Sequence, residues 1–259
     1  MLNAVGRDIP EEILKATGKE VFQGTHHFDG HEFETASHKV KCVINSNGSK
    51  LVDSIHDVLV KCGIKDGMTL SFHHHFRNGD KVLNMVMEEV HAMGIKNITI
   101  CASSLGGQND PIVYMLDDGT ITNIESSGVR GEIGKAISNG RLQGLAIMRS
   151  HGARSRAIMS GETHIDIAFI GAPTADEYGN LNANGGKADC GVLSYSAVDA
   201  EYADRVVAVT DTLVPFPNLP AQISQVKVDY VVKVDEIGDP TKIATGAAKP
   251  TTDQRKLLM

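Results

Sequence analysis

Short runs of β-branched and aliphatic residues alternate with amphipathic segments, and this alternation constrains the fold more than any other feature. One segment from 51 to 62 has apolar residues at helical spacing between Ser49, a candidate N-cap, and Gly63; another runs from Asp80 to Gly94. The candidate strands are residues 68–72, 97–102, 120–125, 166–173, 205–210 and 229–234. Strands joined by helices form parallel sheets. The sequence therefore predicts an α/β fold, a mostly parallel sheet with helices on both faces.

The two ends of the chain depart from this pattern. Residues 1–39 contain one short helix, with Asp8 as its cap and Pro10 in its first turn, followed by a polar, His-rich stretch. We expect an N-terminal arm of residues 1–39 and one α/β domain of residues 40–259. The last residues read as the opening of a helix capped by Thr252 or Asp253, as if the chain were cut there.

Composition argues against several classes of protein. The chain has 25 Lys and Arg against 32 Asp and Glu, a net charge of −7, which disfavours nucleic acid as a partner. It has neither the apolar run of a membrane span nor that of a signal peptide. The four cysteines, Cys42, Cys62, Cys101 and Cys190, lie far apart and read as buried thiols. We therefore expect a cytoplasmic protein without a disulfide framework or a membrane partner.

A polar loop, SFHHHFRNGD at 71–80, follows the first clear strand, at the edge where parallel sheets bind ligands. His73, His75 and Arg77 are candidates for binding an anion there, although a solvated loop has a similar composition. A metal site is the other alternative. Consecutive histidines in an extended segment alternate in direction, which leaves two ligands without a carboxylate, so we expect no metal.

Two further loops, SSLGGQND at 103–110 and SSGVRG at 126–131, are rich in Gly and Ser and precede candidate helices. Exposed backbone N–H groups at such places suit phosphate or carboxylate, although ordinary turns look the same. The candidate binding residues in these loops are Ser104, Gly106, Gly107, Ser127, Gly128 and Arg130. Neither a dinucleotide fingerprint, nor a P-loop, nor a GxSxG elbow is present.

The segment RSHGARSR at 149–156 concentrates positive charge in an acidic chain. Arg149, His151, Arg154 and Arg156 either bind carboxylates or a phosphate, or form an exposed basic face. The Asn- and Gly-rich residues 175–190 are typical of a loop with left-handed turns. The candidates in that loop are Asn180, Gly185 and Gly186, which bind a ligand or merely turn the chain. These residues indicate an enzyme or sensor for a small anion, without an assignable catalytic residue.

These segments resemble the citrate lyase alpha subunit family, the citrate CoA-transferases, over essentially the whole chain. The resemblance is carried by VGRDIPEEILKATGKEVF, DGMTLSFHHHFRNGDKV, ASSLGGQNDPIV, SSGVRGEIGKAIS, DIAFIGAPTADEYGN, DCGVLSYSAVDAEYAD and TDTLVPFPNLPAQISQVKVDYVV. More distantly, DIAFIGAPTADEYGN is similar to the alpha half of other CoA-transferases. Their α/β fold is shared with sugar-phosphate isomerases, which agrees with the fold predicted from the residues.

The resemblance implies a transferase that exchanges acetyl for citrate on a CoA-like thioester and releases acetate. The thioester belongs to a prosthetic group that the gamma (acyl carrier) subunit supplies, so no cofactor is expected to be bound covalently here. The beta subunit then cleaves the citryl group to oxaloacetate. The implied partners are the beta and gamma subunits in an oligomer, with citrate, acetate and an acyl-CoA-like thioester as small molecules.

The resemblance also implies that this chain corresponds to the first of two similar α/β halves. In the wider CoA-transferase group the covalent glutamate lies in the second half, so the resemblance gives no glutamate here that role, Glu177 included. Because the reacting centre of such enzymes lies between the halves, we expect this chain alone to fold but to transfer acyl groups slowly or not at all.

Two other functions fit the same fold. A sugar-phosphate isomerase-like enzyme would be stabilised by sugar phosphates rather than by citrate. A non-catalytic anion-sensing domain would come joined to a basic helix-turn-helix, and residues 1–39 have neither the length nor the charge for one.

Overall fold

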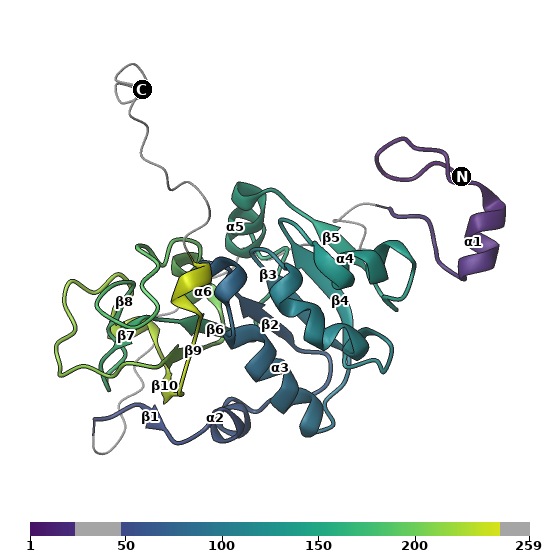
Figure 1. The fold of residues 1–259 in the computed structure, drawn as a ribbon. Helices are drawn as coiled ribbons and strands as arrows, with labels where there is room; N and C mark the ends of the chain where they lie inside the picture. The colour runs from purple at the N-terminus through teal and green to yellow at the C-terminus, as the bar shows by residue number, and fades with distance from the viewer. Residues whose placement is uncertain (24–47, 244–259) are drawn as a thin grey trace, which may run out of the picture.

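The computed structural model describes residues 1–23 and 48–243. Its centre is an eight-stranded sheet in the order β1-β10-β9-β6-β2-β3-β4-β5, and all its strand pairs are parallel (Figure 1). The strands are β1 (Leu51–Val52), β2 (Thr69–Phe72), β3 (Ile98–Ala102), β4 (Ile121–Ser126), β5 (Ala146–Met148), β6 (Ile167–Gly171), β9 (Arg205–Thr210) and β10 (Tyr230–Lys233). The predicted parallel α/β fold is confirmed.

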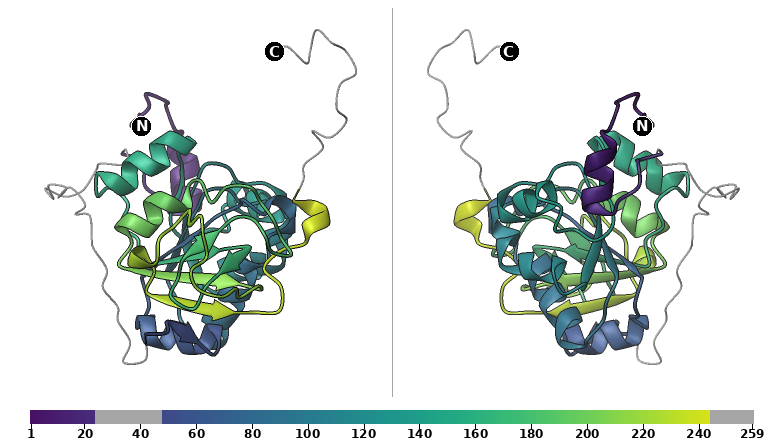
Figure 2. Two further views of the ribbon diagram at one scale, coloured as in Figure 1. Left: turned by 90° about the vertical axis from the view of Figure 1, so that its left-hand side faces the viewer. Right: turned by 90° about the vertical axis from the view of Figure 1, so that its right-hand side faces the viewer.

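Helices cover both faces of this sheet, as Figure 2 shows. On one face lie α2 (Ile55–Cys62), α3 (Val82–Ala92), α4 (Gly131–Ser138) and the 3₁₀ segment η2 (Gly107–Leu116); on the other lie α5 (His151–Met159) and α6 (Ser196–Tyr202). Side chains alternate along each strand, so each face of the sheet has its own hydrophobic core. Phe169 of β6 packs in the core under α2, α3 and α4, and its neighbours Ala168 and Ile170 pack in the core under α5 and α6. Within residues 1–23 and 48–243, none of the helices is long and apolar enough to cross a membrane.

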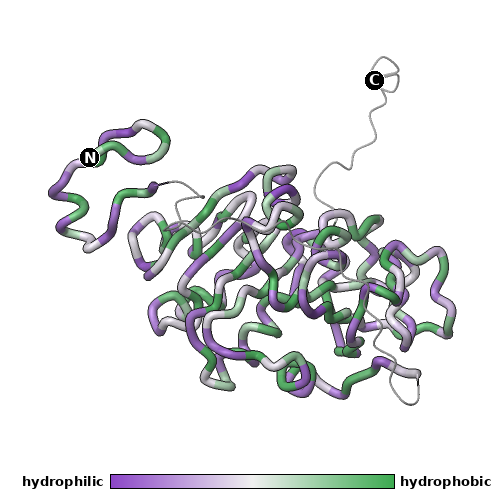
Figure 3. The backbone as a smooth tube through the Cα atoms, turned by 180° about the vertical axis from the view of Figure 1, so that it is seen from behind, coloured by the Kyte–Doolittle hydropathy of each residue, from purple (hydrophilic) through white to green (hydrophobic). Residues whose placement is uncertain are grey.

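The N-terminal residues 1–23 lie to one side of the sheet (Figure 3). Helix α1 (Glu11–Thr17) buries no residue, and the Lys19 ammonium reaches back to donate to the Leu142 carbonyl at 2.8 Å. The predicted cap is wrong: Pro10 occupies the N-cap position, and the Asp8 carboxylate binds the N-terminal ammonium at 2.7 Å. The expected domain boundary at residues 39 and 40, Cys42 and the helix expected after Thr252 lie outside the described residues.

The helix predicted over residues 51–62 begins later than its periodicity indicated. Leu51 and Val52 form the edge strand β1, which pairs with β10, and Ser54 rather than Ser49 caps α2 by accepting a hydrogen bond from the Asp57 amide at 3.0 Å. A short apolar run fits a strand as well as a helical turn, and pairing with a strand far along the chain decides between them.

Three further strands were not predicted. β5 forms the sheet edge next to β4, and the Asn-rich loop contains a small antiparallel hairpin of β7 (Thr174–Ala175) and β8 (Leu181–Asn182). The hairpin is organised by Asp176, whose carboxylate accepts hydrogen bonds from the Tyr178 and Asn180 amides. Such short strands give too little periodicity for the sequence to reveal them.

The strand order places a topological switch point between β2 and β6. From β2 the chain builds outward through β3 and β4 to β5, then returns to place β6 on the other side of β2 before β9 and β10 follow. Loops at the carboxyl ends of β2 and β6 therefore leave in opposite directions and open a crevice. This fold predicts that the ligand site lies there.

The start of α3 gives a testable pH dependence. Asp80 accepts a hydrogen bond from the Leu83 amide at 3.4 Å, one residue before the N-cap Lys81, and burial raises the pKa of its carboxyl to about 7. Between pH 4 and 7 the folded state then holds a proton that the unfolded state has lost. We expect this group to reduce the free energy of unfolding by about 1.4 kcal/mol for each pH unit of rise across that window.

Denaturant unfolding from pH 4 to 8 measures this effect. Asp80→Asn is expected to flatten the pH dependence and to be more stable than the parent at pH 8, because asparagine can accept the same hydrogen bond from the Leu83 amide but carries no charge. The exposed Asp53→Asn is the matched control and should keep the parent slope. An Asp80→Asn slope equal to the parent's contradicts the prediction.

Candidate functional site

Two adjoining cavities lie at the carboxyl ends of the strands, beside the switch point. Cavity A has a volume of about 280 Å³ and is lined by His73, His74, His75, Arg77, Ser103, His151, Cys190, Val192, Leu193, Ser194 and Tyr195. Cavity B has a volume of about 320 Å³ and is lined by His74, Arg77, Asn78, Ser104, Gly106, Gln108, Ser127, Gly128, Arg130 and His151. His74, Arg77 and His151 line both, so the two cavities share a wall.

Two arginines of this site lack a carboxylate partner. Within the described residues, neither Arg77 nor Arg130 forms an ion pair, and both line cavity B. Arg77 has a φ of +54°, an unfavourable backbone conformation for a residue other than glycine. Strain of this kind concentrates at binding sites, where the surrounding structure holds it in place. The two guanidiniums make cavity B attractive to an anion.

A buried ion pair lies beneath cavity A. Asp199 of α6 accepts hydrogen bonds from both terminal nitrogens of Arg154 in α5, at 3.0 and 2.8 Å. The same Arg154 donates to the Ser71 hydroxyl at 2.8 Å, and Ser71 donates in turn to Asp199. His73 Nε2 lies 2.6 Å from the Asp199 carboxylate and Nδ1 lies 3.4 Å from the Phe169 carbonyl. This network fixes the His73 ring between two strands and a helix.

The charges of this network favour its ionised form. Burial raises the pKa of the Asp199 carboxyl, but the nearby Arg154 and His73 lower it more, so the pKa lies well below its usual range. Burial likewise opposes the charge of Arg154, yet Asp199 raises the pKa of the guanidinium. The pair is therefore charged at neutral pH and holds the floor of cavity A in one arrangement.

His74 lies on the wall that the two cavities share, and its ring contacts Ser103. The Ser103 hydroxyl accepts from the His74 backbone amide at 3.0 Å and lies 2.6 Å from Nδ1 of the same residue. Burial, together with the charges of Arg77 and of neighbouring histidines, lowers the pKa of His74 to about 4. The ring is therefore neutral at pH 7, and in the tautomer in which Ser103 donates to Nδ1 the ring proton is on Nε2.

His75 is also neutral at pH 7. Burial, with the neighbouring His73, lowers its pKa to about 3, and Nε2 lies 2.8 Å from the Gly171 carbonyl at the end of β6. Its ring packs edge-on against Phe76, at a centroid distance of 4.4 Å. Since both histidines are uncharged, the arginines rather than His74 and His75 supply the positive charge of the site.

Cavity B also holds two buried oxygen atoms without a partner. Gln108 Oε1 and Ser127 Oγ form no hydrogen bond with the described residues. By contrast, the backbone amides proposed as anion donors are used internally: the Gly106 N–H donates to Asn109 Oδ1, and the Gly128 N–H to Ser126 Oγ, each at 3.2 Å. The Gly106 and Gly128 amides are therefore already engaged within their own loops.

Several candidate residues lie away from both cavities. The arginines of residues 149–156 are paired: Arg149 with Glu125 and Glu162, Arg154 with Asp199, and Arg156 with Glu162. The side chains of Arg149 and Arg154 are buried against these carboxylates, whereas that of Arg156 is exposed. Gly107, Asn180, Gly185 and Gly186 do not line either cavity.

The Asn180 and Gly186 positions have structural explanations. The Asn180 amide group donates to Asp176 at 2.8 Å, while its oxygen accepts from the Gln225 backbone at 3.1 Å, so it braces the β7–β8 hairpin. A Cβ at Gly186 would lie 2.0 Å from the Pro173 carbonyl oxygen, which leaves room for glycine alone.

Sequence reasoning missed His74 and the segment before α6. His74 was passed over because neighbours in a strand alternate, but the chain turns directly after β2. Tyr195 packs on His151 at a ring-centroid distance of 4.8 Å, and Cys190 lies half-buried in the same wall rather than fully buried as expected. Ser103 and Gln108 were inside a predicted loop but were not singled out.

A family model described as the citrate lyase alpha subunit matches residues 48–259. The citrate lyase alpha chain of Haemophilus influenzae is 48% identical over 210 residues, which are 81% of this chain and 42% of that relative. The Escherichia coli K12 alpha chain is 46% identical over 210 residues, 81% of this chain and 41% of that relative. The chain thus spans less than half the length of these curated relatives.

Solved structures agree. The citrate lyase alpha subunit of Streptococcus mutans, determined in complex with citrate, is 49% identical with a TM-score of 0.82 and covers 99% of this chain and 49% of that one. Glutaconate coenzyme A-transferase from Acidaminococcus fermentans has a TM-score of 0.55 at 13% identity, and covers 71% of this chain and 75% of that one. The latter likeness concerns the fold alone.

Proposed function

The chain belongs to the citrate lyase alpha subunit family, and from this premise we propose that it binds citrate for an acyl transfer. In the proposed reaction citrate replaces acetyl on the CoA-like thioester of an acyl carrier (gamma) subunit, and acetate leaves. The beta subunit would then cleave the citryl group, within one multi-subunit complex. The observation that carries the proposal is the pair of unpartnered guanidiniums, Arg77 and Arg130, in cavity B.

Citrate matches the groups that line cavity B. Its carboxylates are suited to forked hydrogen bonds from Arg77 and Arg130, which would satisfy charges that have no carboxylate partner in the described chain. Its hydroxyl group can donate to Gln108 Oε1, a buried acceptor without a partner. Ser127 Oγ can donate to a further carboxylate oxygen. A sugar phosphate offers only one strongly charged group to the same two arginines.

Cavity A is the proposed place for the thioester end of the carrier's arm. Addition of a carboxylate oxygen to the thioester carbonyl places negative charge on the carbonyl oxygen, which a positioned donor stabilises. His74 lies on the wall common to both cavities and is neutral at pH 7, and with its proton on Nε2 it would donate a hydrogen bond to that oxygen. A hydrogen bond from Ser103 to Nδ1 would hold this tautomer, and the Asp199–Arg154 pair keeps the adjacent His73 in place.

The first test is the citrate affinity of Arg77→Ala, measured by calorimetry. Loss of one charge-assisted contact is expected to cost about 1.5–3 kcal/mol, which weakens binding by roughly 10- to 150-fold. Arg7→Ala removes an exposed arginine outside both cavities and should bind citrate like the parent. An Arg77→Ala variant with the parent's affinity would remove this residue from the site.

A thermal-shift comparison distinguishes the proposal from the isomerase-like alternative. Citrate is expected to raise the melting temperature, and pentose or hexose phosphates at the same concentration are expected to leave it unchanged. The opposite order would favour an isomerase-like function. Binding of citrate without acyl exchange, even with the C-terminal half and carrier supplied, would favour the anion-sensing alternative.

A further inference from the structure

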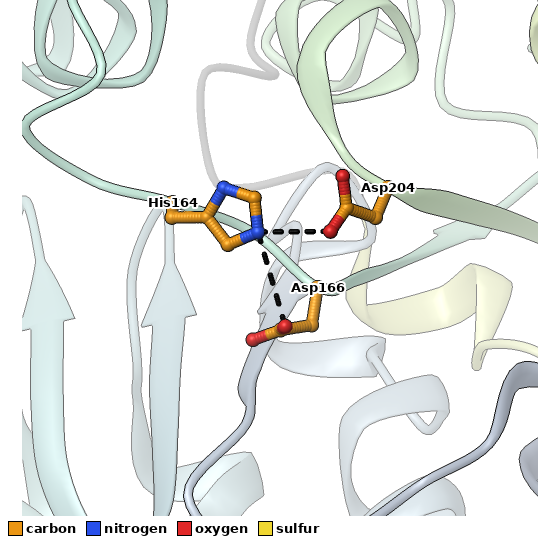
Figure 4. Close-up of side chains that lie close together, drawn as sticks. All are labelled: His164, Asp166 and Asp204. Carbon is orange, nitrogen blue, oxygen red and sulfur yellow. Dashed lines mark hydrogen bonds and ion pairs between the residues drawn. The ribbon is translucent and has the colours of Figure 1, made fainter. Parts of the chain in front are cut away.

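A second group of polar side chains lies at the amino ends of the strands, opposite the carboxyl ends where the two cavities lie. His164 and Asp166 precede β6, and Asp204 precedes β9, so all three lie at the amino ends of adjacent strands (Figure 4). His164 Nε2 lies 2.9 Å from Asp204 Oδ2 and 3.8 Å from Asp166 Oδ1. We propose that these three residues bind a divalent transition-metal ion, with Zn²⁺ as its probe, that ties together the starts of β6 and β9.

The backbone holds this group in position. The Asp204 amide donates to the Ile165 carbonyl and the Arg205 amide to the Asp166 carbonyl, both at 2.9 Å. The Asp166 carboxylate is also held from β2, where the Thr69 amide donates to its second oxygen at 2.7 Å. One oxygen is thus anchored while the other faces His164. Anchoring of a ligand's second atom is what orients carboxylates at metal sites.

The ligand set and spacing suit a small, borderline ion. One imidazole nitrogen and two carboxylate oxygens favour Zn²⁺, Co²⁺ or Mn²⁺ over Ca²⁺, which takes oxygen ligands. A tetrahedral ion with bonds of about 2.0–2.2 Å separates its ligand atoms by about 3.3–3.5 Å. The two observed distances, 2.9 and 3.8 Å, lie on either side of that value. The two carboxylate oxygens lie within 4.8 Å of each other, and rotation of the exposed His164 side chain would seat the ion among the three ligand atoms.

Exposure leaves both a route for the ion and a position for water. The His164 side chain is 61% exposed, so a fourth ligand can come from solvent. In the described part of the chain, this is the one group of three His, Cys, Asp or Glu residues whose ligand atoms all lie within 4.8 Å of one another. At the histidine loop, residues 73–75, the sequence predicts no metal site, and we propose none there.

The consequence is structural rather than catalytic. An ion at this edge is far along the strands from the proposed citrate site, but it would bind the folded chain more tightly than the unfolded one. Such binding raises stability by mass action. The proposal does not depend on the proposed acyl transfer, and the two can fail separately.

The test uses chelator-treated protein titrated with Zn²⁺ in calorimetry and thermal unfolding. We expect binding by the parent and a rise in its melting temperature that EDTA reverses. His164→Ala and Asp204→Asn should each weaken Zn²⁺ affinity at least about tenfold and reduce the rise in melting temperature. The control is His56→Ala, an exposed histidine paired with the single carboxylate of Glu89, which should behave like the parent.

Crystals soaked in Zn²⁺ locate the ion by anomalous scattering, which separates this site from the chain's other histidines. Density between His164, Asp166 and Asp204 supports the proposal. Three results overturn it: no Zn²⁺ binding by the parent, equal affinities for the parent and His164→Ala, or an ion bound only elsewhere. Circular dichroism of metal-free variants checks that the substitutions leave the fold intact.

Discussion

The 259-residue chain is expected to bind citrate and yet to exchange acetyl for citrate at least roughly a thousandfold more slowly alone than with a C-terminal half supplied. The physical reason is the composition of the two cavities. Their lining residues include arginines, histidines, serines and amides, but no Asp or Glu. A stepwise exchange through an enzyme carboxylate therefore finds no nucleophile in the described site.

Glu177 does not fill this role. It lies in the turn between β7 and β8, where its backbone carbonyl accepts from the Lys50 amide at 2.8 Å, and it lines neither cavity. The relatives extend well beyond the matched region, since the 210 matched residues are 42% of the Haemophilus influenzae chain. The carboxylate and the far wall of the cleft are expected to come from that additional length.

The measurement is an exchange assay with acetyl-CoA as a surrogate thioester and citrate as acceptor. It is run with this chain alone and with the separately expressed C-terminal half of the Haemophilus influenzae alpha chain. Calorimetry with citrate is the control, because binding should survive without that half. Equal turnover with and without it would contradict the prediction and place the catalytic residues within the described loops.

Arg154→Ala is expected to be the most destabilising single substitution at this site, lowering the free energy of unfolding by about 3–5 kcal/mol. It leaves the fully buried Asp199 carboxylate without its strongest partner and removes a donor from Ser71. The remaining contacts of Asp199, with His73 and Ser71, cannot replace a forked pair. The ring of His73 should lose its fixed orientation, and the floor of cavity A with it.

Urea unfolding measures the stability loss, and Arg156→Ala is the matched control. Arg156 lies two residues away on the same helix, and its exposed side chain pairs with Glu162, so its loss is expected to cost less than about 1 kcal/mol. A double change, Arg154→Met with Asp199→Leu, should recover part of the stability because no buried charge is left alone. Equal losses for Arg154→Ala and Arg156→Ala would refute the assignment.

The same pair gives a pH signature. The pKa of Asp199 is lower in the folded than in the unfolded chain, because Arg154 and His73 outweigh the effect of burial. Its stabilising contribution is therefore fully present above the ordinary carboxyl pKa, near 4, and is lost as the pH falls below that value. Asp199→Asn should show a weaker loss of stability on acidification than the parent.

The site shows what can be learned from the residues themselves. The sequence predicted β9 at its observed bounds because residues 205–210 are rich in β-branched and small side chains. The structure buries five of these six residues. Arg77, Ser127 and Arg130 were selected because their loops follow predicted strands, and all three line cavity B. Rules of this kind depend on neighbours a few positions away, which a sequence displays directly.

No pattern of neighbouring residues in the sequence indicates the role of Asp199. On α6 it reads as an ordinary acidic helix residue, yet it meets Ser71 and His73 from 128 and 126 positions along the chain. Arg154 likewise reads as part of an exposed basic run until α5 packs against α6 and buries it. In each case the partner, and not the residue type, decides whether the charge faces solvent or the core.

The sequence by itself determined the parallel α/β architecture and the strand ends at which the site forms, because hydrophobic periodicity and turn chemistry act over a few residues. Only the tertiary structure decided which histidines line both cavities, which arginines remain unpaired and where β1 begins. Those outcomes depend on how charges and backbone groups from distant segments satisfy one another when the sheet closes, since a buried polar group is stable only with a partner.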